Sequence, residues 1–253
     1  MFLKVSHESN YIKWRIQRPE RRNGLGVSIG NELLNAIDNL RNVLRTQQAT
    51  RALVISAASS DSTKGRIWIA GGDLKELALL KEKKEGREYG HIFQKICRGL
   101  ETLPIPVIFL IDGHAIGGGI ELSLAGDFRF ASPESLFVFK QTRIGLATGY
   151  GGATRLNRIV GPARASHWLL ASKSVTATEA LNDRLIQGIW PPQDFEQNTA
   201  TLVDEIAKSP FQAIAAQKSM LASNNQTSLE HELIEFENLW MEPDHKRFLD
   251  SFH

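Results

Sequence analysis

Two glycine-bearing segments have the residue types of a backbone site for a negatively charged oxygen. Gly71 and Gly72 lie within residues 69–77, and three consecutive glycines, 117–119, lie within residues 113–122. Each segment follows an apolar stretch that predicts a strand, and each leads into a predicted helix. Glycine lets a ligand approach the backbone closely, and the free N–H groups at a helix start favour negative charge. Two such turns brought together could hold one oxygen atom between two N–H donors.

Glu121 follows the second glycine run in an apolar setting. It lies three residues after Gly118, one helical turn on, so its carboxylate can lie near whatever the Gly118 N–H binds. The neighbours Ile120 and Leu122 predict burial, and a buried carboxylate without a partner is costly. A buried structural salt bridge is the alternative to a catalytic role. Each glycine turn alone could likewise be only a tight connection, and neither spacing fits the G-x-G-x-x-G pattern of dinucleotide sites.

The composition excludes several classes of protein. Of the 253 residues 42% are hydrophobic and 23% are charged, which is typical of a globular protein. The net charge of +2 is too small to predict a nucleic-acid or membrane partner. Cys97 is the only cysteine, which excludes internal disulfides and multi-cysteine metal sites, and we expect no metal. We find no secretory signal and no apolar run long enough to span a bilayer, so we expect a cytoplasmic protein.

Strands that alternate with helices must position the two glycine turns. From apolar periodicity we predict strands over residues 10–17, 51–57, 67–70, 107–111, 128–131 and 136–139. We predict helices from Ser28 onward and over 74–102, 211–222 and 228–241, with a further helix starting at 120–124. This alternation favours an α/β fold with parallel strand pairing. We divide the chain into a core, 1–195, and a C-terminal helical region, 196–253, within one functional unit.

Short motifs follow one another along the chain at fixed spacing. Residues 70–76 read A-G-G-D-L-K-E and residues 113–122 read G-H-A-I-G-G-G-I-E-L. Further motifs lie at 18–23, 127–131, 145–146, 149–152 and 155–156. Together they resemble the crotonase superfamily, also called the enoyl-CoA hydratase/isomerase family, over almost the whole chain. The resemblance implies a crotonase-like superhelix of stacked ββα turns and a C-terminal helical region that assembles a homotrimer or a dimer of trimers.

The same resemblance implies an acyl-CoA thioester substrate, with coenzyme A as part of the substrate and no separate cofactor. It assigns the oxyanion-hole donors to the backbone N–H groups of Gly72 and Gly118, and the two catalytic positions to Glu121 and Gln141. Two preorganised N–H donors stabilise the enolate through which the family's reactions pass. The remaining substrate and coenzyme contacts are assigned to Arg22, Gly24, Ala70, Gly71, Asp73, Leu74, Gly117 and Tyr150.

Gln141 departs from the family pattern, in which a second glutamate stands at this position. An amide cannot take up a proton at neutral pH, although it can orient a water or a carbonyl. Hydration of a double bond needs both a base and an acid, whereas decarboxylation of a malonyl-type thioester generates the enolate directly. Residues 127–135 are also similar to the branch that decarboxylates ethylmalonyl-CoA. We therefore favour decarboxylation; the alternatives are a conventional or weak hydratase/isomerase, an acyl-CoA hydrolase and a catalytically silent member.

Overall fold

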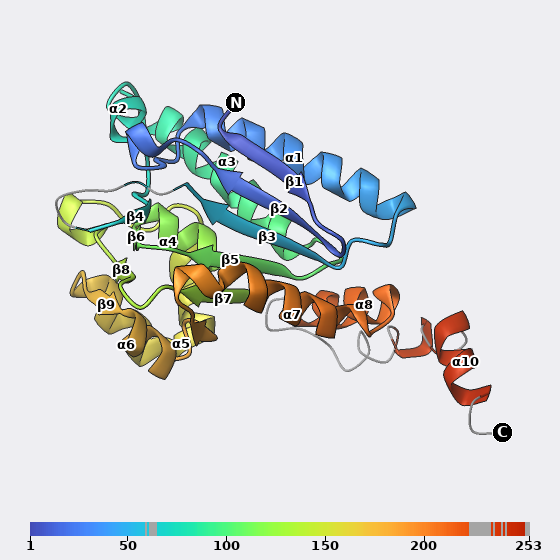
Figure 1. Cartoon of the computed structure of the whole chain (residues 1–253). Helices are drawn as coiled ribbons and strands as arrows, with labels where there is room; N and C mark the ends of the chain where they lie inside the picture. The colour runs from blue at the N-terminus through green and yellow to red at the C-terminus, as the bar shows by residue number, and fades with distance from the viewer. Residues whose placement is uncertain are drawn as a thin grey trace.

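The structure is a computed structural model that describes residues 1–58, 60, 65–222, 234, 236–238, 240 and 242–250. In this part of the chain the strands form two sheets (Figure 1). The larger has the order β1 (Leu3–His7), β2 (Tyr11–Ile16), β3 (Ala52–Ala57), β5 (Val107–Ile111), β7 (Phe128–Ala131) and β10 (Gly188–Ile189). The smaller has the order β4 (Ile67–Ile69), β6 (His114–Ile116), β8 (Leu136–Val138) and β9 (Ser174–Thr176). All pairs are parallel except β1–β2 and β8–β9, which confirms the predicted α/β class.

Helices surround the two sheets. The longer ones are α1 (Val27–Thr46), α3 (Lys83–Glu101), α5 (Gly152–Leu170), α7 (Phe195–Ala207), α8 (Phe211–Ala222) and α10 (Pro243–Asp250). The shorter ones are α2 (Leu74–Leu77), α4 (Gly118–Ser123) and α6 (Ala177–Asn182), with 3-10 turns at Pro19–Arg21, Thr142–Ile144 and Pro192–Asp194. Within the described residues, none of these helices has the length and apolar character needed to cross a membrane.

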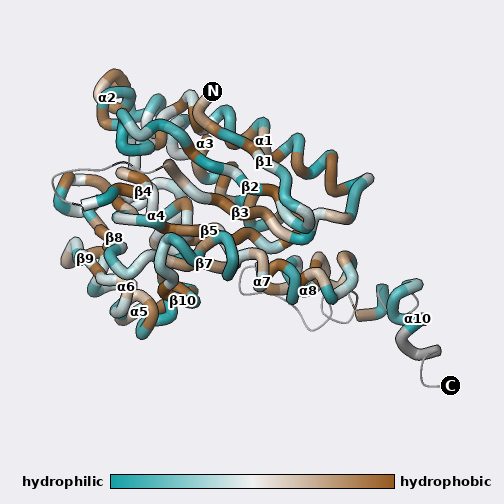
Figure 2. Tube along the Cα trace, viewed as in Figure 1, coloured by the Kyte–Doolittle hydropathy of each residue, from teal (hydrophilic) through white to brown (hydrophobic). Residues whose placement is uncertain are grey.

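The central strands of the larger sheet, β3 and β5, are buried on both faces. Alternate residues of β3 point in opposite directions, so Leu53 and Ile55 join the main core with α1 and α3, whereas Val54 joins a second core. In that second core Phe195 and Val203 of α7 cover the sheet. Figure 2 shows the hydrophobic colour concentrated in the strands. The middle of the larger sheet is thus held between helices on both sides.

α1 has the periodicity expected of it but begins one residue before Ser28. Its inward residues at i, i+3 and i+4 spacing are all buried: Ile29, Leu33, Ile37, Leu40 and Leu44. Gly26 is the N-cap and has no side chain to accept a hydrogen bond from the first turn. The Glu76 carboxylate does so instead, accepting from Val27 N at 2.8 Å. The helix start is therefore capped from α2, which no local pattern could indicate.

The single helix predicted over 74–102 is wrong, because two helix starts lie within that charged segment. The Asp73 carboxylate caps α2 by accepting from Lys75 N at 3.0 Å and Glu76 N at 3.4 Å. Glu82 and Glu85 then form a capping box that begins α3. Each cap satisfies N–H groups that a continuous helix would have bonded to its preceding turn. The chain therefore turns between residues 77 and 83.

A buried lysine anchors the C-terminal helices to the core. Lys218 of α8 donates to the carbonyl oxygens of Leu100, at 3.2 Å, and Ile105, at 2.7 Å, and pairs with the Asp127 carboxylate at 2.6 Å. Burial lowers the pKa of Lys218, and the nearby Asp127 carboxylate opposes this by raising it. The helix predicted at 228–241 lies mostly outside the described residues. Within that range the structure describes residues 234, 236–238 and 240, and these are helical. The division at residue 195 stays a prediction, and α10 lies apart from the sheets (Figure 1).

Candidate active site

The structure brings the two glycine turns together. β4 and β6 are parallel neighbours, with Ile69 opposite Ala115, so the turns that follow them leave the same edge of the smaller sheet. A Cβ atom on Gly71 would lie 2.8 Å from the Ile116 carbonyl oxygen and 3.2 Å from Gly118 N. Gly71 also has a φ of +89°, which favours glycine. The close approach predicted from the sequence is thus present.

The N–H groups of Gly72 and Gly118 are both available to a ligand. Gly72 forms a parallel bridge with Leu25, in which Leu25 N donates to Gly71 O and Asp73 N donates to Leu25 O. That pattern turns the Gly72 N–H away from Leu25. Gly118 is the first residue of α4, where the N–H groups lack helical partners. Neither group has a hydrogen-bond partner among the residues that the structure describes.

Glu121 is buried beside these groups and is held by four donors. Its Oε2 accepts from Tyr150 N at 2.8 Å and Gly152 N at 3.1 Å. Its Oε1 accepts from Gln141 Nε2 at 3.0 Å and, more weakly, from Gly149 N at 3.4 Å. Burial raises the pKa of Glu121, and the four donors oppose that rise. Among the residues that the structure describes, no Lys, Arg or His forms a salt bridge with Glu121. The alternative of a structural ion pair is therefore wrong for this part of the chain.

Gln141 occupies the place opposite Glu121. It precedes the 3-10 turn Thr142–Ile144, and its amide nitrogen lies within hydrogen-bond distance of Glu121 Oε1. Its amide oxygen is buried and has no partner in the described part of the chain. Such an atom can accept a hydrogen bond from a water or a substrate group, but it cannot transfer a proton. The pair therefore holds one ionisable group.

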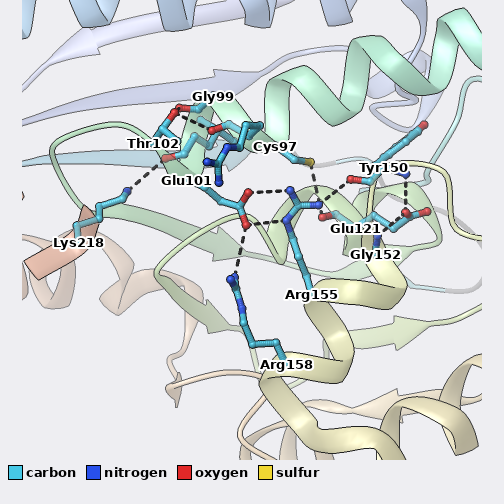
Figure 3. A network of polar contacts seen from close by, with 12 residues as sticks. Cys97, Gly99, Glu101, Thr102, Glu121, Tyr150, Gly152, Arg155, Arg158 and Lys218 are labelled. Carbon is cyan, nitrogen blue, oxygen red and sulfur yellow. Dashed lines mark hydrogen bonds and ion pairs between the residues drawn. The ribbon is translucent and has the colours of Figure 1, made fainter. Parts of the chain in front are cut away.

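An ionic network of Glu101, Arg155 and Arg158 holds the backbone of Tyr150 (Figure 3). Arg155 binds both oxygens of Glu101, each at 2.8 Å, and donates to Tyr150 O at 2.7 Å. Arg158 adds a contact to Glu101 at 3.4 Å. Because the N–H of the same Tyr150 holds Glu121, the network sets the position of the carboxylate. Sequence reasoning missed Glu101 and recorded Arg155 only as a motif match, since nothing local signals a partner so far along the chain.

Of the residues assigned to coenzyme A, Asp73 is occupied by contacts within the protein. Its carboxylate pairs with Arg18 at 3.1 Å and Arg21 at 3.6 Å, in addition to capping α2. The Gly24 backbone packs against the backbone of Asp73, since a Cβ atom on Gly24 would lie 3.2 Å from Asp73 Cα. Arg18 is buried, and sequence reasoning recorded it only as part of the motif at 18–23. Arg22 and Leu74 are exposed near the same turn, and a role in binding the coenzyme stays a prediction for all of them.

The segment that resembles the decarboxylase branch, residues 127–135, holds the fold together. Asp127 accepts from Val107 N at 2.7 Å and pairs with Lys218. Arg129 is buried and donates to Leu185 O at 2.7 Å. The hydroxyl group of Ser132 accepts from the Gly113 N–H at 3.2 Å. These side chains contact the backbone of the fold, so the local resemblance describes the scaffold and carries no information about the reaction.

Comparison with known proteins agrees with this geometry. The model of the family described as enoyl-CoA hydratase/isomerase matches residues 6–248. The chain is 27% identical to the short-chain-enoyl-CoA hydratase of Clostridium acetobutylicum, over 94% of this chain and 88% of that protein. It is 28% identical to the crotonyl-CoA hydratase of Syntrophomonas wolfei, over 85% of this chain and 79% of that protein.

A solved structure extends the likeness to three dimensions. The crystal structure of the enoyl-CoA hydratase from Bacillus anthracis superposes with a TM-score of 0.89 at 26% identity, covering 100% of this chain and 96% of that one. The family model, which matches nearly the whole chain, therefore fits both the sequence motifs and the fold. The chain belongs to the enoyl-CoA hydratase/isomerase family of acyl-CoA-processing enzymes.

Proposed function

We propose that the chain decarboxylates a malonyl-type acyl-CoA thioester through an enolate held by the N–H groups of Gly72 and Gly118. The observation that carries the proposal is the contact of Gln141 Nε2 with Glu121 Oε1 at 3.0 Å. An amide stands where a second carboxylate would complete an acid/base pair. The reaction best suited to this site needs an enolate hole and a single proton donor.

Decarboxylation meets that condition. The bond between Cα and the substrate carboxylate breaks, carbon dioxide leaves, and the electron pair of the bond becomes the thioester enolate. Two backbone donors stabilise its oxygen, and losing one such donor costs about a hundredfold to a thousandfold in rate. A proton then moves from the protonated Glu121 carboxyl to Cα, and solvent restores it. The raised pKa of Glu121, caused by burial, supports this role because it favours the protonated form.

Hydration of a short-chain enoyl-CoA is the second candidate. The names of the relatives from Clostridium acetobutylicum and Syntrophomonas wolfei favour it. In this reaction Glu121 alone would take a proton from water and return one to Cα. The partnerless oxygen of Gln141 would accept a hydrogen bond from that water and orient it. The loss of the second proton-transfer group would slow the reaction by about a hundredfold or more.

A substrate panel distinguishes the two reactions. The protein is incubated with crotonyl-, malonyl-, methylmalonyl- and ethylmalonyl-CoA, and products are identified by mass spectrometry. We expect loss of carbon dioxide from a malonyl-type substrate at a higher kcat/KM than addition of water to crotonyl-CoA. The opposite ranking would refute decarboxylation and establish hydration. Hydrolysis to free coenzyme A, or no product with any substrate, would refute both.

We propose that the protein assembles as a homotrimer or a dimer of trimers through its C-terminal helices. Large apolar side chains are exposed there: Leu221, Ile234, Phe236 and Trp240. Phe236 and Trp240 also contact each other, with ring centroids 5.1 Å apart. Burying such side chains against another subunit would remove apolar area from water. Sedimentation at micromolar concentration should give a trimer or hexamer mass, and a monomer mass would contradict the proposal.

A further inference from the structure

We propose that Tyr89 and Tyr150 form a closed wall at the acyl end of the site and restrict the substrate to short acyl chains. The inference rests on the proposed binding of the thioester at Gly72 and Gly118. Nothing in the sequence connects the two tyrosines, which lie 61 residues apart. The structure places both against the glycines of the hole.

The contact with the hole is direct on both sides. A Cβ atom on Gly118 would lie 2.6 Å from Cε2 of the Tyr150 ring. One on Gly72 would lie 2.6 Å from Leu77 Cδ1 and 3.0 Å from the Tyr89 hydroxyl oxygen. The two hydroxyl groups are hydrogen-bonded to each other and join the rings into one surface. Both tyrosines are buried. The space beside the hole is thus occupied from α3 and from the loop before α5.

The hydrogen bonds show that the wall is fixed and does not serve as an acid. The Leu25 carbonyl oxygen can only accept, so Tyr89, 2.8 Å away, must donate to it. Tyr150 must then donate to Tyr89, and both phenol protons are committed within the protein. Burial raises the pKa of both phenols, which keeps them neutral. The pair therefore limits space and leaves proton transfer to Glu121.

Neighbouring groups support the wall from behind. Phe93 stacks on the Tyr150 ring, with centroids 4.5 Å apart and an interplanar angle of 23°. Arg155 holds the Tyr150 carbonyl, and Gln94 Nε2 donates to Gly149 O at 3.0 Å. A longer acyl chain could displace the rings only by breaking several of these contacts at once. A densely packed group of this kind resists insertion of even a few methylenes.

The exposure of the surroundings gives the direction of the substrate. Leu74, directly after the Gly72 turn, is 73% exposed, and Arg22 is exposed nearby, so the coenzyme leaves the hole on that side. The tyrosines lie on the buried side, where Tyr89 is 9% and Tyr150 is 5% exposed. The Cα of the thioester must also lie on the side of Glu121, whose carboxylate binds Tyr150 N. An acyl chain that grows beyond Cα therefore meets the wall.

The test compares the binding of butyryl-CoA and octanoyl-CoA by calorimetry. Wild-type protein should bind butyryl-CoA at least about tenfold more tightly, since single methylenes in a fitted pocket are worth that much. Tyr150→Ala should bring the ratio to within about threefold. Tyr150→Phe, which keeps the ring, should retain the wild-type ratio. Tyr11→Ala removes a buried tyrosine of the second core and should also retain it.

Both ligands are measured on the same preparation of each variant. Partial unfolding therefore lowers both binding signals equally and leaves the ratio of the two affinities unchanged. Should Tyr150→Ala fail to fold, Tyr89→Leu opens the same wall from α3 and should shift the ratio in the same direction. Equal binding of both ligands by wild-type protein would overturn the inference, and so would an unchanged ratio in the opened variant. If the affinity ratios are as expected but no substrate is decarboxylated, the proposed reaction is refuted and the inference about the tyrosine wall stands. Absence of acyl-CoA binding would refute both.

Discussion

The four donors around Glu121 determine the outcome of a Glu121→Gln substitution. The carboxylate offers two acceptor oxygens, whereas the amide offers one oxygen and an NH2 group. The new oxygen can keep the bonds from Tyr150 N and Gly152 N. The new NH2 then faces Gln141, whose own oxygen is without a partner in the described structure. A flip of the Gln141 amide presents that oxygen and restores the bond.

The cost in stability should accordingly be small. Only the weak contact with Gly149 N, at 3.4 Å, has no replacement. We expect the free energy of unfolding to fall by no more than about 1 kcal/mol, or roughly 2–4 °C in Tm. Glu121→Ala instead leaves buried N–H groups unpaired at about 1–3 kcal/mol each. It should therefore lower stability by at least about 3 kcal/mol.

Turnover should fall by about a hundredfold to ten-thousandfold in both variants, the usual contribution of one proton-transfer group. Urea unfolding and steady-state assays with the preferred substrate give the two quantities. Glu32→Gln is the matched control, since Glu32 also accepts two backbone bonds, from Phe2 N at 2.7 Å and Leu3 N at 3.0 Å, and is not among the residues bonded to Glu121. Turnover of Glu121→Gln within tenfold of wild type would remove Glu121 from the mechanism, even if the stability prediction held.

Three further predictions concern the same site. Gln141→Glu should raise crotonyl-CoA hydration above wild type in steady-state assays, because two facing carboxylates raise one pKa and supply an acid; a variant no faster than wild type would contradict this. Gly118→Ala should lower kcat by about a hundredfold or more, since the new Cβ would lie 2.6 Å from the Tyr150 ring; unchanged kcat would exclude Gly118 from the hole. Burial raises the pKa of Glu121 above 4.5, so a rate that uses its proton is full below the raised value and falls as pH increases through it. A pH profile should show this limb in wild type and lose it in Glu121→Gln.

Local signals predicted those elements whose residues pack by a simple period. β5 has the bounds expected of it, Val107–Ile111, because an unbroken apolar run follows Pro106. α8 likewise matches the predicted 211–222. Thr176 and Glu179 form a capping box at the start of α6, with Thr176 N donating to Glu179 Oε2 at 2.8 Å. In each case the information lies within a few residues.

Four strands escaped prediction, β1, β6, β9 and β10, and the first two show the effect of non-local pairing. β1 (Leu3–His7) is a short edge strand in which only Leu3 is buried. It exists through antiparallel pairing with β2. β6 (His114–Ile116) has three residues inside a glycine-rich stretch that indicates a turn. Its strand conformation comes from β4 and β8 on either side, to which the local sequence gives no guide.

The residues of the candidate site likewise fall into those that local sequence predicts and those that it does not. The glycine turns and Glu121 could be predicted because spacing along one strand, turn and helix places them. The Tyr89–Tyr150 pair and the Arg155–Glu101 ion pair join residues 61 and 54 positions apart, so no spacing rule reveals them. The physical reason for each becomes visible only when α3 lies beside α5.

The Lys218 anchor has a consequence for how the chain is made. Lys218 lies 118 residues after Leu100, whose carbonyl it binds, and Leu100 adjoins the Glu101 that holds Arg155. During synthesis, every element of the acyl-CoA site leaves the ribosome before the lysine that anchors this turn. A nascent chain, or one truncated before residue 218, therefore carries the candidate catalytic residues but lacks the ammonium that fixes the end of α3. The end of α3 is therefore fixed only after α8 has docked against it.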